Sequence, residues 1–182
     1  MPVRLSDYTT LFLDRDGVLN RRLIADYVKR PEEFEWLPGV LPALQVLRPR
    51  FSRVVVVTNQ QGVGKGLMTD VDLAAVHRRM RGQAAAVGVN FDAVYACTSL
   101  AADQDPRRKP GPGMGHEAQA EFPEIDFRQS IMVGDSPSDM AFGEGLGMAC
   151  VGIGDRVAVA ERYDSLWDWV EATTPPSGGR PL

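Results

Sequence analysis

Two carboxylates, Asp14 and Asp16, stand one residue apart, after the apolar run 11–13 and before Gly17. In an extended strand alternate side chains point the same way, so both carboxylates would lie on one face. Carboxylates that close repel each other unless a cation lies beside them. A hard, oxygen-ligated ion such as Mg²⁺ meets that need. The pair therefore indicates a divalent metal site, although Asp-x-Asp-Gly is also favourable turn chemistry.

Two later apolar runs also end at polar residues. Thr58 follows the four valines of 54–57, and Asp135 follows the run 131–133 and a glycine. Short runs rich in Val and Ile are typical of strands buried on both faces of a parallel sheet. Ligands of such sheets bind beyond the carboxyl ends of the strands. If the three strands are neighbours, Thr58 and Asp135 converge with the first carboxylate pair on one crevice.

Each of these polar residues has a chemical interpretation. Asp135 would supply a third acidic metal ligand, and Asp139, one helical turn further on, could orient that ligand or the metal's waters. The Thr58 hydroxyl could donate to an anion in the crevice. The alternative for Thr58 is a strand-end threonine satisfied by the backbone, which would be the better interpretation if it stood alone.

Lys109 is a candidate for the cation of this crevice. It precedes Pro110 and could neutralise a phosphate together with the carboxylates. The alternative is that Lys109 belongs, with Arg107 and Arg108, to a solvated basic cluster on the surface.

Composition bounds the class of protein. The chain has 182 residues, 44% of them hydrophobic, which fits one domain, expected over 1–172. The segment 173–182 is rich in Pro and Gly and is expected to be a flexible tail. A net charge of −4 gives no reason to expect a nucleic-acid partner. No run approaches the roughly 20 apolar residues of a membrane span.

The two cysteines, Cys97 and Cys150, are not at metal-binding spacing and are expected to be buried free thiols. A reducing compartment, the cytoplasm, is the expected location. The two histidines also lack a partner at metal-ligand spacing. His77 is expected on the surface of a long helix, and His116 near a helix start.

Strands and helices alternate along the chain, which predicts an α/β fold with a parallel sheet. Apolar runs predict strands at 11–13, 54–57, 91–97, 131–133 and 149–153. Periodicity and end signals predict a first helix that begins at 38–39 and is stopped by Pro49. Further helices are predicted at 70–87, at about 113–122 and from Ser136 or Ser138 through Ala141, with a helical or mixed segment at 156–172. In the second helix, Val87 is expected to face the core. The irregular segments 20–36 and 98–112 are expected to be loops. Segment 20–36 either flanks the crevice or is a surface loop anchored by an aromatic side chain.

Taken together, the motifs resemble those of the haloacid-dehalogenase (HAD) superfamily of phosphatases. The matching segments are 14–20, 58–60, 109–110 and 134–135 with Asp139. The finer pattern resembles the branch that contains D-glycero-D-manno-heptose-1,7-bisphosphate phosphatases and histidinol phosphatases. The resemblance implies a Rossmann-like three-layer sandwich around a central parallel sheet, with little or no cap.

The resemblance also implies roles for the crevice residues. Asp14 would be the nucleophile that forms an aspartyl-phosphate. Asp16 would protonate the leaving oxygen and then activate water. Thr58 and Lys109 would hold the phosphoryl oxygens as charge builds in the transition state.

Metal and substrate contacts are implied as well. Mg²⁺ would be held by the Asp14 side chain, the Asp16 backbone carbonyl and Asp135, with Asp139 in support. The three residues that match substrate-contacting positions of the family are Asn59, Gln60 and Arg108.

One departure concerns a structural zinc that members of this branch commonly hold before the Arg-Lys pair. Of the expected ligands only Cys97 remains, while Ser99, Asp105 and Arg107 occupy the other three places. A closed tetrahedral site needs four ligands, so we predict no structural zinc. In the family this loop borders the substrate, so its change leaves the exact sugar open.

The leading hypothesis is a Mg²⁺-dependent phosphatase of a small phosphorylated metabolite, a heptose 1,7-bisphosphate losing its 7-phosphate. The alternatives are a histidinol-phosphate or broader sugar-phosphate phosphatase, and a phosphate-binding module without turnover. The module should lack a catalytic carboxylate, whereas Asp14, Asp16 and Asp135 are all present. Phosphotransfer to an acceptor would need a cap, and none is evident. The chain is expected to be a monomer.

Overall fold

The computed structural model describes residues 3–174 and contains one six-stranded sheet with the order β3-β2-β1-β4-β5-β6. Every neighbouring pair of strands is parallel. The strands are β1 (Thr10–Leu13), β2 (Arg53–Asn59), β3 (Ala93–Cys97), β4 (Ser130–Gly134), β5 (Ala149–Ile153) and β6 (Arg162–Tyr163). This order is that of a doubly wound sheet, whose ligand crevice lies where the order reverses, beside β1.

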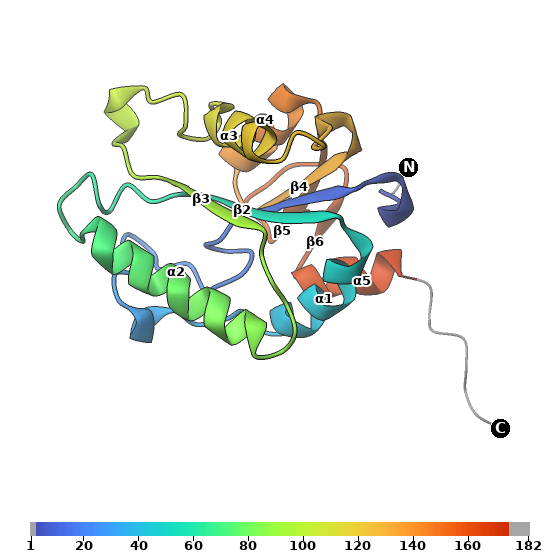
Figure 1. Ribbon diagram of the computed structural model, residues 1–182, viewed down its shortest axis with the longest axis horizontal. Coiled ribbons are helices and arrows are strands. Elements are labelled where there is room, and N and C mark those ends of the chain that lie inside the picture. The colour runs from blue at the N-terminus through green and yellow to red at the C-terminus, as the bar shows by residue number, and fades with distance from the viewer. Residues whose placement is uncertain (1–2, 175–182) are drawn as a thin grey trace.

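Helices cover both faces of the sheet (Figure 1). Their bounds are α1 (Val40–Leu47), α2 (Asp70–Ala85), α3 (Gly113–Glu121), α4 (Pro137–Leu146) and α5 (Leu166–Thr173). In Figure 1, α1, α2 and α5 lie on one side of the sheet, and α3 and α4 lie on the other. The result is a three-layer α/β/α sandwich.

Two hydrophobic cores correspond to these two faces. Along β1 the side chains alternate, so Leu11 and Leu13 pack in the core that includes α1, α2 and α5, and Phe12 packs in the core that includes α3 and α4. All three are fully buried. Because β1 is buried on both faces, it shows no polar alternation, which is why it appears in the sequence as a short apolar run.

The segments that could hold a cap carry only short 3₁₀ helices. These are Pro31–Glu33 between β1 and α1, and Ala101–Asp103 between β3 and α3. Among residues 3–174, no separate cap domain covers the carboxyl ends of the strands. The predicted fold, an α/β sandwich with little or no cap, is confirmed.

Some element boundaries differ from the prediction. α4 continues to Leu146, past the predicted end at Ala141. Gly143 within it packs closely against the sheet, and a Cβ there would lie 2.6 Å from Cys150 Sγ. The mixed segment contains a two-residue strand, β6, which is too short to leave a periodic signal. The prediction that Val87 faces the core is wrong, because α2 ends at Ala85 and Val87, beyond that end, is 37% exposed.

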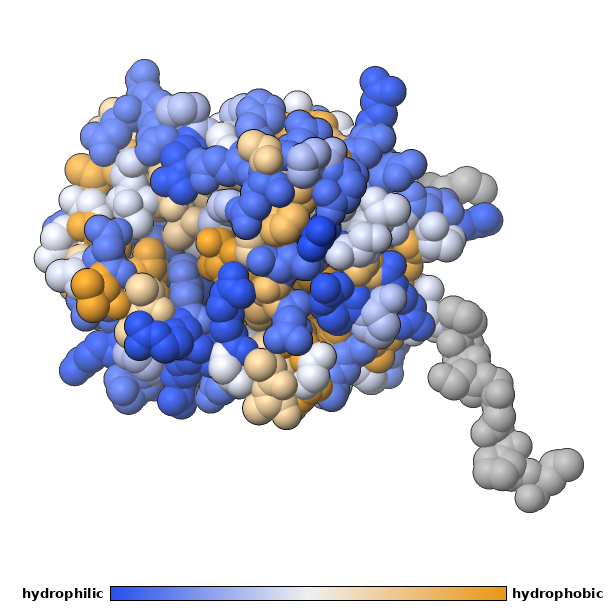
Figure 2. Space-filling view, in the orientation of Figure 1, coloured by the Kyte–Doolittle hydropathy of each residue, from blue (hydrophilic) through white to orange (hydrophobic). Residues whose placement is uncertain are grey.

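The C-terminal prediction is only partly covered by the structure. α5 ends at Thr173, so the helix includes the first residue of the expected tail. Residues 175–182 lie outside the described residues. In the part of the chain from 3 to 174, no helix is long and apolar enough to cross a membrane. The face seen in Figure 2 is mainly hydrophilic, with small separate hydrophobic areas.

Candidate active site

The carboxyl ends of β1, β2 and β4 bring the predicted residues together. In register, Leu13 of β1 lies between Val56 of β2 and Val133 of β4. Asp14 follows directly, and its backbone N–H donates to the Val133 carbonyl at 2.9 Å. Gly17 then turns the chain with φ +90°, and a Cβ at this position would lie 2.2 Å from Asp135 Oδ2. Glycine is therefore required here, both by the backbone angle and by the close approach of Asp135.

Lys109 is buried and is not part of a solvated basic cluster. Its Nζ donates to Asp14 Oδ1 at 2.7 Å, to Asp139 Oδ1 at 2.6 Å and to the Val57 carbonyl at 2.7 Å. All three ammonium donors are thereby satisfied. Burial alone would lower the pKa of Lys109, but the charges of Asp139 and Asp14 raise it above its ordinary value. Lys109 is therefore a fixed cation at the carboxyl ends of the strands.

Asp139 links this cation to the start of α4. Its Oδ2 accepts from the Ser136 backbone N–H at 3.0 Å and from the Ser136 hydroxyl at 2.6 Å, completing a capping box. Its Oδ1 accepts from Lys109. Both oxygens are engaged, so Asp139 acts in this geometry as a support for Lys109 and for the helix start that follows Asp135.

Three carboxylates form the candidate metal centre. Asp14, Asp135 and Asp139 each offer an oxygen, and these oxygens lie within 4.8 Å of one another. Burial and the Asp139 charge raise the pKa of Asp14 to about 8 against the opposing charge of Lys109, and burial also raises that of Asp135. A bound divalent cation would favour the ionised forms instead. A buried cluster of this kind, with oxygen ligands alone, fits Mg²⁺.

Asp135 has a cationic neighbour that the sequence did not reveal. Arg156, from the loop after β5, donates from Nη1 to Asp135 Oδ2 at 2.7 Å. The Arg156 side chain is 41% exposed, so this contact lies at the mouth of the crevice. Only the order of the strands, which places the ends of β4 and β5 side by side, could have indicated this contact.

Asp16 is held by three side chains. Gln60 donates to Oδ2 at 2.7 Å, Asn20 donates to Oδ1 at 3.0 Å, and Arg15 Nη2 contacts both oxygens at 3.1 and 3.0 Å. Burial alone would raise the pKa of Asp16, but the Arg15 charge and these hydrogen bonds hold it below its usual value. Asp16 therefore sits in a preorganised cradle of donors.

Arg15 and His77 are the main surprises of the site. The Arg15 side chain is fully buried, and its Nη1 lies 3.1 Å from His77 Nε2 on α2. His77 is half-buried, so its predicted position on the helix surface is wrong. Burial, with a smaller effect from the Arg15 charge, lowers the pKa of His77 to about 3. Neither role has a local sequence signal, because the two residues are 62 positions apart.

The remaining predicted residues lie in three different environments. Thr58 and Gln60 are buried and bonded to each other, the amide donating to the hydroxyl at 2.8 Å. Asn59 exchanges two hydrogen bonds of 3.0 Å with the Lys109 backbone, which fixes the start of the Lys-Pro segment. Arg108 Nη1 is buried and has no hydrogen-bond partner among residues 3–174.

Two adjoining pockets open at these residues. The inner pocket, of about 210 Å³, is lined by the acidic cluster together with Thr58, Arg108 and Lys109. The outer pocket, of about 420 Å³, is lined in part by Tyr27 and Lys65. Both pockets share Asp16, Arg22 and Asn59. Gln60 lines neither of them, because its amide is committed to Asp16 and Thr58.

The loop that departs from the zinc-binding pattern is organised by Asp105. Its Oδ2 accepts from the Ser99 hydroxyl at 2.5 Å and from Cys97 Sγ at 3.7 Å, and its Oδ1 accepts from the Arg107 backbone N–H at 2.8 Å. The Cys97, Ser99 and Asp105 side chains are thus joined by hydrogen bonds, and Arg107 joins them through its backbone. Among residues 3–174, no group of three metal-binding side chains includes them.

Comparison with known proteins agrees with this geometry. Residues 11–147 match the family model described as polynucleotide kinase 3 phosphatase. A crystal structure of a D,D-heptose 1,7-bisphosphate phosphatase from B. bronchiseptica, complexed with magnesium and phosphate, matches with a TM-score of 0.81 and 30% identity, covering 90% of this chain and 97% of that one. The fold and the arrangement of acidic residues define a HAD-like phosphatase.

Curated relatives show which family of HAD-like phosphatases contains this chain. A D-glycero-alpha-D-manno-heptose-1,7-bisphosphate 7-phosphatase from Mycobacterium tuberculosis is 40% identical, over 93% of this chain and 94% of its own length. The beta-named enzyme from Rhodopseudomonas palustris is 35% identical, over 75% of this chain and 78% of its own length. The chain belongs to the heptose-1,7-bisphosphate phosphatase family, and the resemblance found in the sequence is confirmed.

Proposed function

We propose that the chain is a Mg²⁺-dependent phosphatase that removes the 7-phosphate from D-glycero-D-manno-heptose 1,7-bisphosphate. The observation that carries this proposal is the position of Asp16 at the boundary of the inner and outer pockets. A phosphoryl group in the inner pocket would lie beside Asp14, while the sugar that leaves would occupy the outer pocket. Asp16 would then lie beside the oxygen that joins the two.

The chemistry follows from this placement. The Asp14 carboxylate attacks phosphorus, the bond from phosphorus to the sugar oxygen breaks, and Asp16 gives that oxygen a proton. Asp16 then takes a proton from water as the water attacks the phosphorus of the aspartyl-phosphate, which restores Asp14 and releases phosphate. Lys109 is proposed to hold phosphoryl oxygens together with Thr58 and to balance the charge of Asp14.

Metal and substrate contacts complete the proposal. The Asp14 and Asp135 side chains and the Asp16 carbonyl would hold Mg²⁺, with Asp139 in support, and the bound ion would neutralise charge on the transferring phosphoryl group. The unpartnered Arg108 Nη1 in the inner pocket is available to the phosphate. Asn59 would contact the substrate from the position that the two pockets share, and Gln60 would act through Asp16.

The α anomer is the proposed form of the substrate, since the relative at 40% identity is named for it. Beta-named relatives also belong to the family, so the test must include both anomers. The outer pocket is lined by Arg22 and Lys65, whose charges suit the phosphate that remains on the sugar.

Domain, assembly and location are proposed from the same features. One domain spanning 1–172 is supported by the single sheet and its two cores. A monomer in the cytoplasm is supported by the hydrophilic face in Figure 2 and by two free cysteines, Cys97 and Cys150. The negative charge of the chain gives no support to a nucleic-acid partner.

Phosphate release from a substrate panel tests the proposal. The panel contains both anomers of the heptose 1,7-bisphosphate, histidinol phosphate and simple sugar phosphates, each with and without Mg²⁺. We expect Mg²⁺-dependent release with a strong preference for the α-bisphosphate. Preference for histidinol phosphate, or equal rates across the panel, would contradict the assigned substrate. Binding of phosphate without turnover of any compound would contradict the phosphatase itself.

A further inference from the structure

The buried guanidinium of Arg15 is held at only two points. Among residues 3–174, its nitrogens have two hydrogen-bond partners, the Asp16 carboxylate and His77 Nε2, and its Nε has none. The side chain is fully buried, so no solvent replaces a lost partner. The orientation of Arg15 therefore depends on His77 as much as on Asp16.

The chemistry of the two groups fixes the direction of the contact. A guanidinium has only donors, so Arg15 Nη1 must donate and His77 Nε2 must accept at 3.1 Å. His77 is therefore neutral, with its proton on Nδ1. The lowered pKa of His77 agrees with this assignment. The charges that face His77 are Arg15 and Asp16 from the β1 loop and Arg81 from its own helix, one turn further on.

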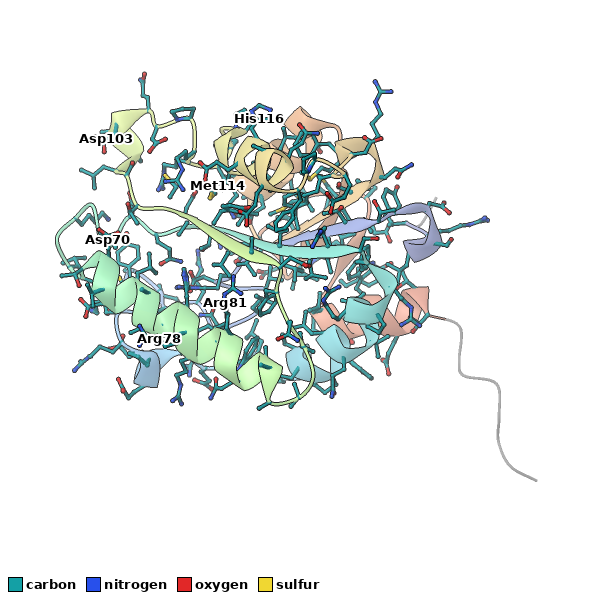
Figure 3. The ribbon with its side chains drawn as sticks, viewed as in Figure 1. Asp70, Arg78, Arg81, Asp103, Met114 and His116 are labelled. Carbon is teal, nitrogen blue, oxygen red and sulfur yellow. The ribbon has the colours of Figure 1, made fainter. Side chains whose placement is uncertain are left out.

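The contacts of Arg15 also connect α2 to the proposed acid–base residue. Asp16 follows β1, whereas His77 lies in the middle of α2, whose side facing the sheet also carries Arg81 in Figure 3. The Arg81 Nη1 donates to the Phe91 carbonyl and is not a partner of His77. The His77–Arg15–Asp16 chain is thus a direct connection between a helix of the scaffold and the proposed acid–base group.

We propose that His77 is a positioning residue for catalysis, which acts through Arg15 to hold the Asp16 carboxylate at the leaving-group oxygen. Asn20 and Gln60 each contact one oxygen of Asp16, but Arg15 contacts both. Loss of the His77 acceptor would leave Nη1 buried without a partner and release the guanidinium to reorient. The inference rests on the proposed acid–base role of Asp16.

Leaving-group dependence distinguishes this role from simple support of the fold. An alkyl phosphate needs a proton on its leaving oxygen, whereas p-nitrophenyl phosphate has a leaving group stable enough to depart without one. We expect His77→Leu to lower kcat/KM for an alkyl sugar phosphate by at least about tenfold, the size of a lost hydrogen bond to a charged group, with a much smaller loss for p-nitrophenyl phosphate. The constant kcat/KM is compared because it covers departure of the leaving group and excludes hydrolysis of the aspartyl-phosphate, which is the same for both substrates. The ratio of the two kcat/KM values is the readout.

Conservative and control variants sharpen the result. His77→Gln places an amide acceptor near the position of Nε2 and should restore most of the ratio. His116→Leu changes the other histidine, which is exposed and lies on α3, and should leave the ratio unchanged. An equal loss for both substrates in His77→Leu, or no rescue by His77→Gln, would overturn the proposal.

Two further measurements distinguish failure of the inference about His77 from failure of the proposed function. Asp16→Asn should show the same split between substrates, and more strongly. If Asp16→Asn shows it and His77→Leu does not, the inference about His77 fails while the proposed function stands. If Asp16→Asn shows no split, the acid–base role fails and the inference fails with it. A second measurement does not depend on activity. At pH 7, ¹⁵N NMR of the two imidazoles should show His77 Nε2 unprotonated, and a proton on Nε2 would overturn the proposal.

Discussion

Lys109 Nζ lies 2.7 Å from Asp14 Oδ1, although the two residues are 95 positions apart in the chain. The contact joins the loop before α3 to the end of β1 and places a fixed positive charge on the proposed nucleophile. The same ammonium contacts Asp139 at 2.6 Å, so one cation serves two buried carboxylates. This arrangement leads to predictions for both activity and stability.

Replacement of Asp14 by Asn should abolish turnover and preserve the fold. The change is nearly isosteric, and the amide oxygen can still accept from Lys109, but an amide is not a nucleophile for phosphorus. Phosphate release under saturating substrate and Mg²⁺ measures the loss, and circular dichroism with thermal unfolding checks the fold. Appreciable turnover by a folded Asp14→Asn variant would remove Asp14 from the role of nucleophile.

Replacement of Lys109 by Met should reduce both stability and activity. Removing one partner of a buried ion pair leaves an uncompensated charge and costs about 3–5 kcal/mol of unfolding free energy. Adding Asp139→Asn should recover part of that loss, because one of the two stranded carboxylates disappears. Urea unfolding, followed by tryptophan fluorescence in the absence of metal, provides the comparison. Lys65→Met, at an exposed lysine, is the matched control and should stay within about 0.5 kcal/mol of wild type.

Additivity would argue against this account of Lys109. Suppose that adding Asp139→Asn to Lys109→Met lowered the free energy of unfolding by as much as Asp139→Asn lowers it in the wild-type protein. The two side chains would then be energetically independent. The 2.6 Å contact between them would then contribute nothing measurable.

The buried state of His77 should make stability depend on pH. Its pKa is lowered from 6.5 to about 3 in the folded protein, so between these values the unfolded chain binds a proton that the folded chain does not. Stability linked to His77 is therefore complete above about pH 6.5 and is lost as pH falls towards 3, at no more than about 1.4 kcal/mol per pH unit. Urea unfolding at pH 7.5 and pH 5 should show a larger loss for wild type than for His77→Gln. Equal losses would mean that His77 titrates alike in both states.

Removal of bound metal should stop activity, and zinc should not be needed to restore it. We expect a chelator to stop phosphate release and Mg²⁺ alone to restore it, because the cluster around Asp14 and Asp135 contains only oxygen ligands. Elemental analysis of purified protein should find no stoichiometric zinc, since Asp105 holds the loop by hydrogen bonds. Near-stoichiometric zinc, or a need for zinc in the restoration, would contradict this prediction.

Much of the candidate site could be predicted from the sequence, because short apolar runs mark where the strands end. Asp14, Thr58 and Asp135 each follow an apolar run, and parallel strands place such positions at one edge of the sheet. The positions of Arg15 and His77 could not be predicted in this way. An arginine beside two aspartates suggests exposure, and only the placement of α2 against the β1 loop shows that Arg15 is buried and paired.

The fold, too, could be predicted only in part from the sequence. The helix–strand alternation was sufficient to predict a parallel α/β sheet, and the resemblance to the HAD superfamily implied its three layers. The continuation of α4 through Gly143, which fits closely against Cys150 and Met132 of neighbouring strands, was not predicted. A glycine that allows close packing cannot be distinguished from a helix-breaking glycine until the neighbouring surface is known.

The most direct test of the central claim is ³¹P NMR of D-glycero-α-D-manno-heptose 1,7-bisphosphate incubated with the protein, with and without Mg²⁺. The account predicts that the 7-phosphate signal is replaced by inorganic phosphate, that the 1-phosphate signal persists, and that neither change occurs without the metal. Loss of the 1-phosphate, or an unchanged spectrum when Mg²⁺ is present, would contradict it.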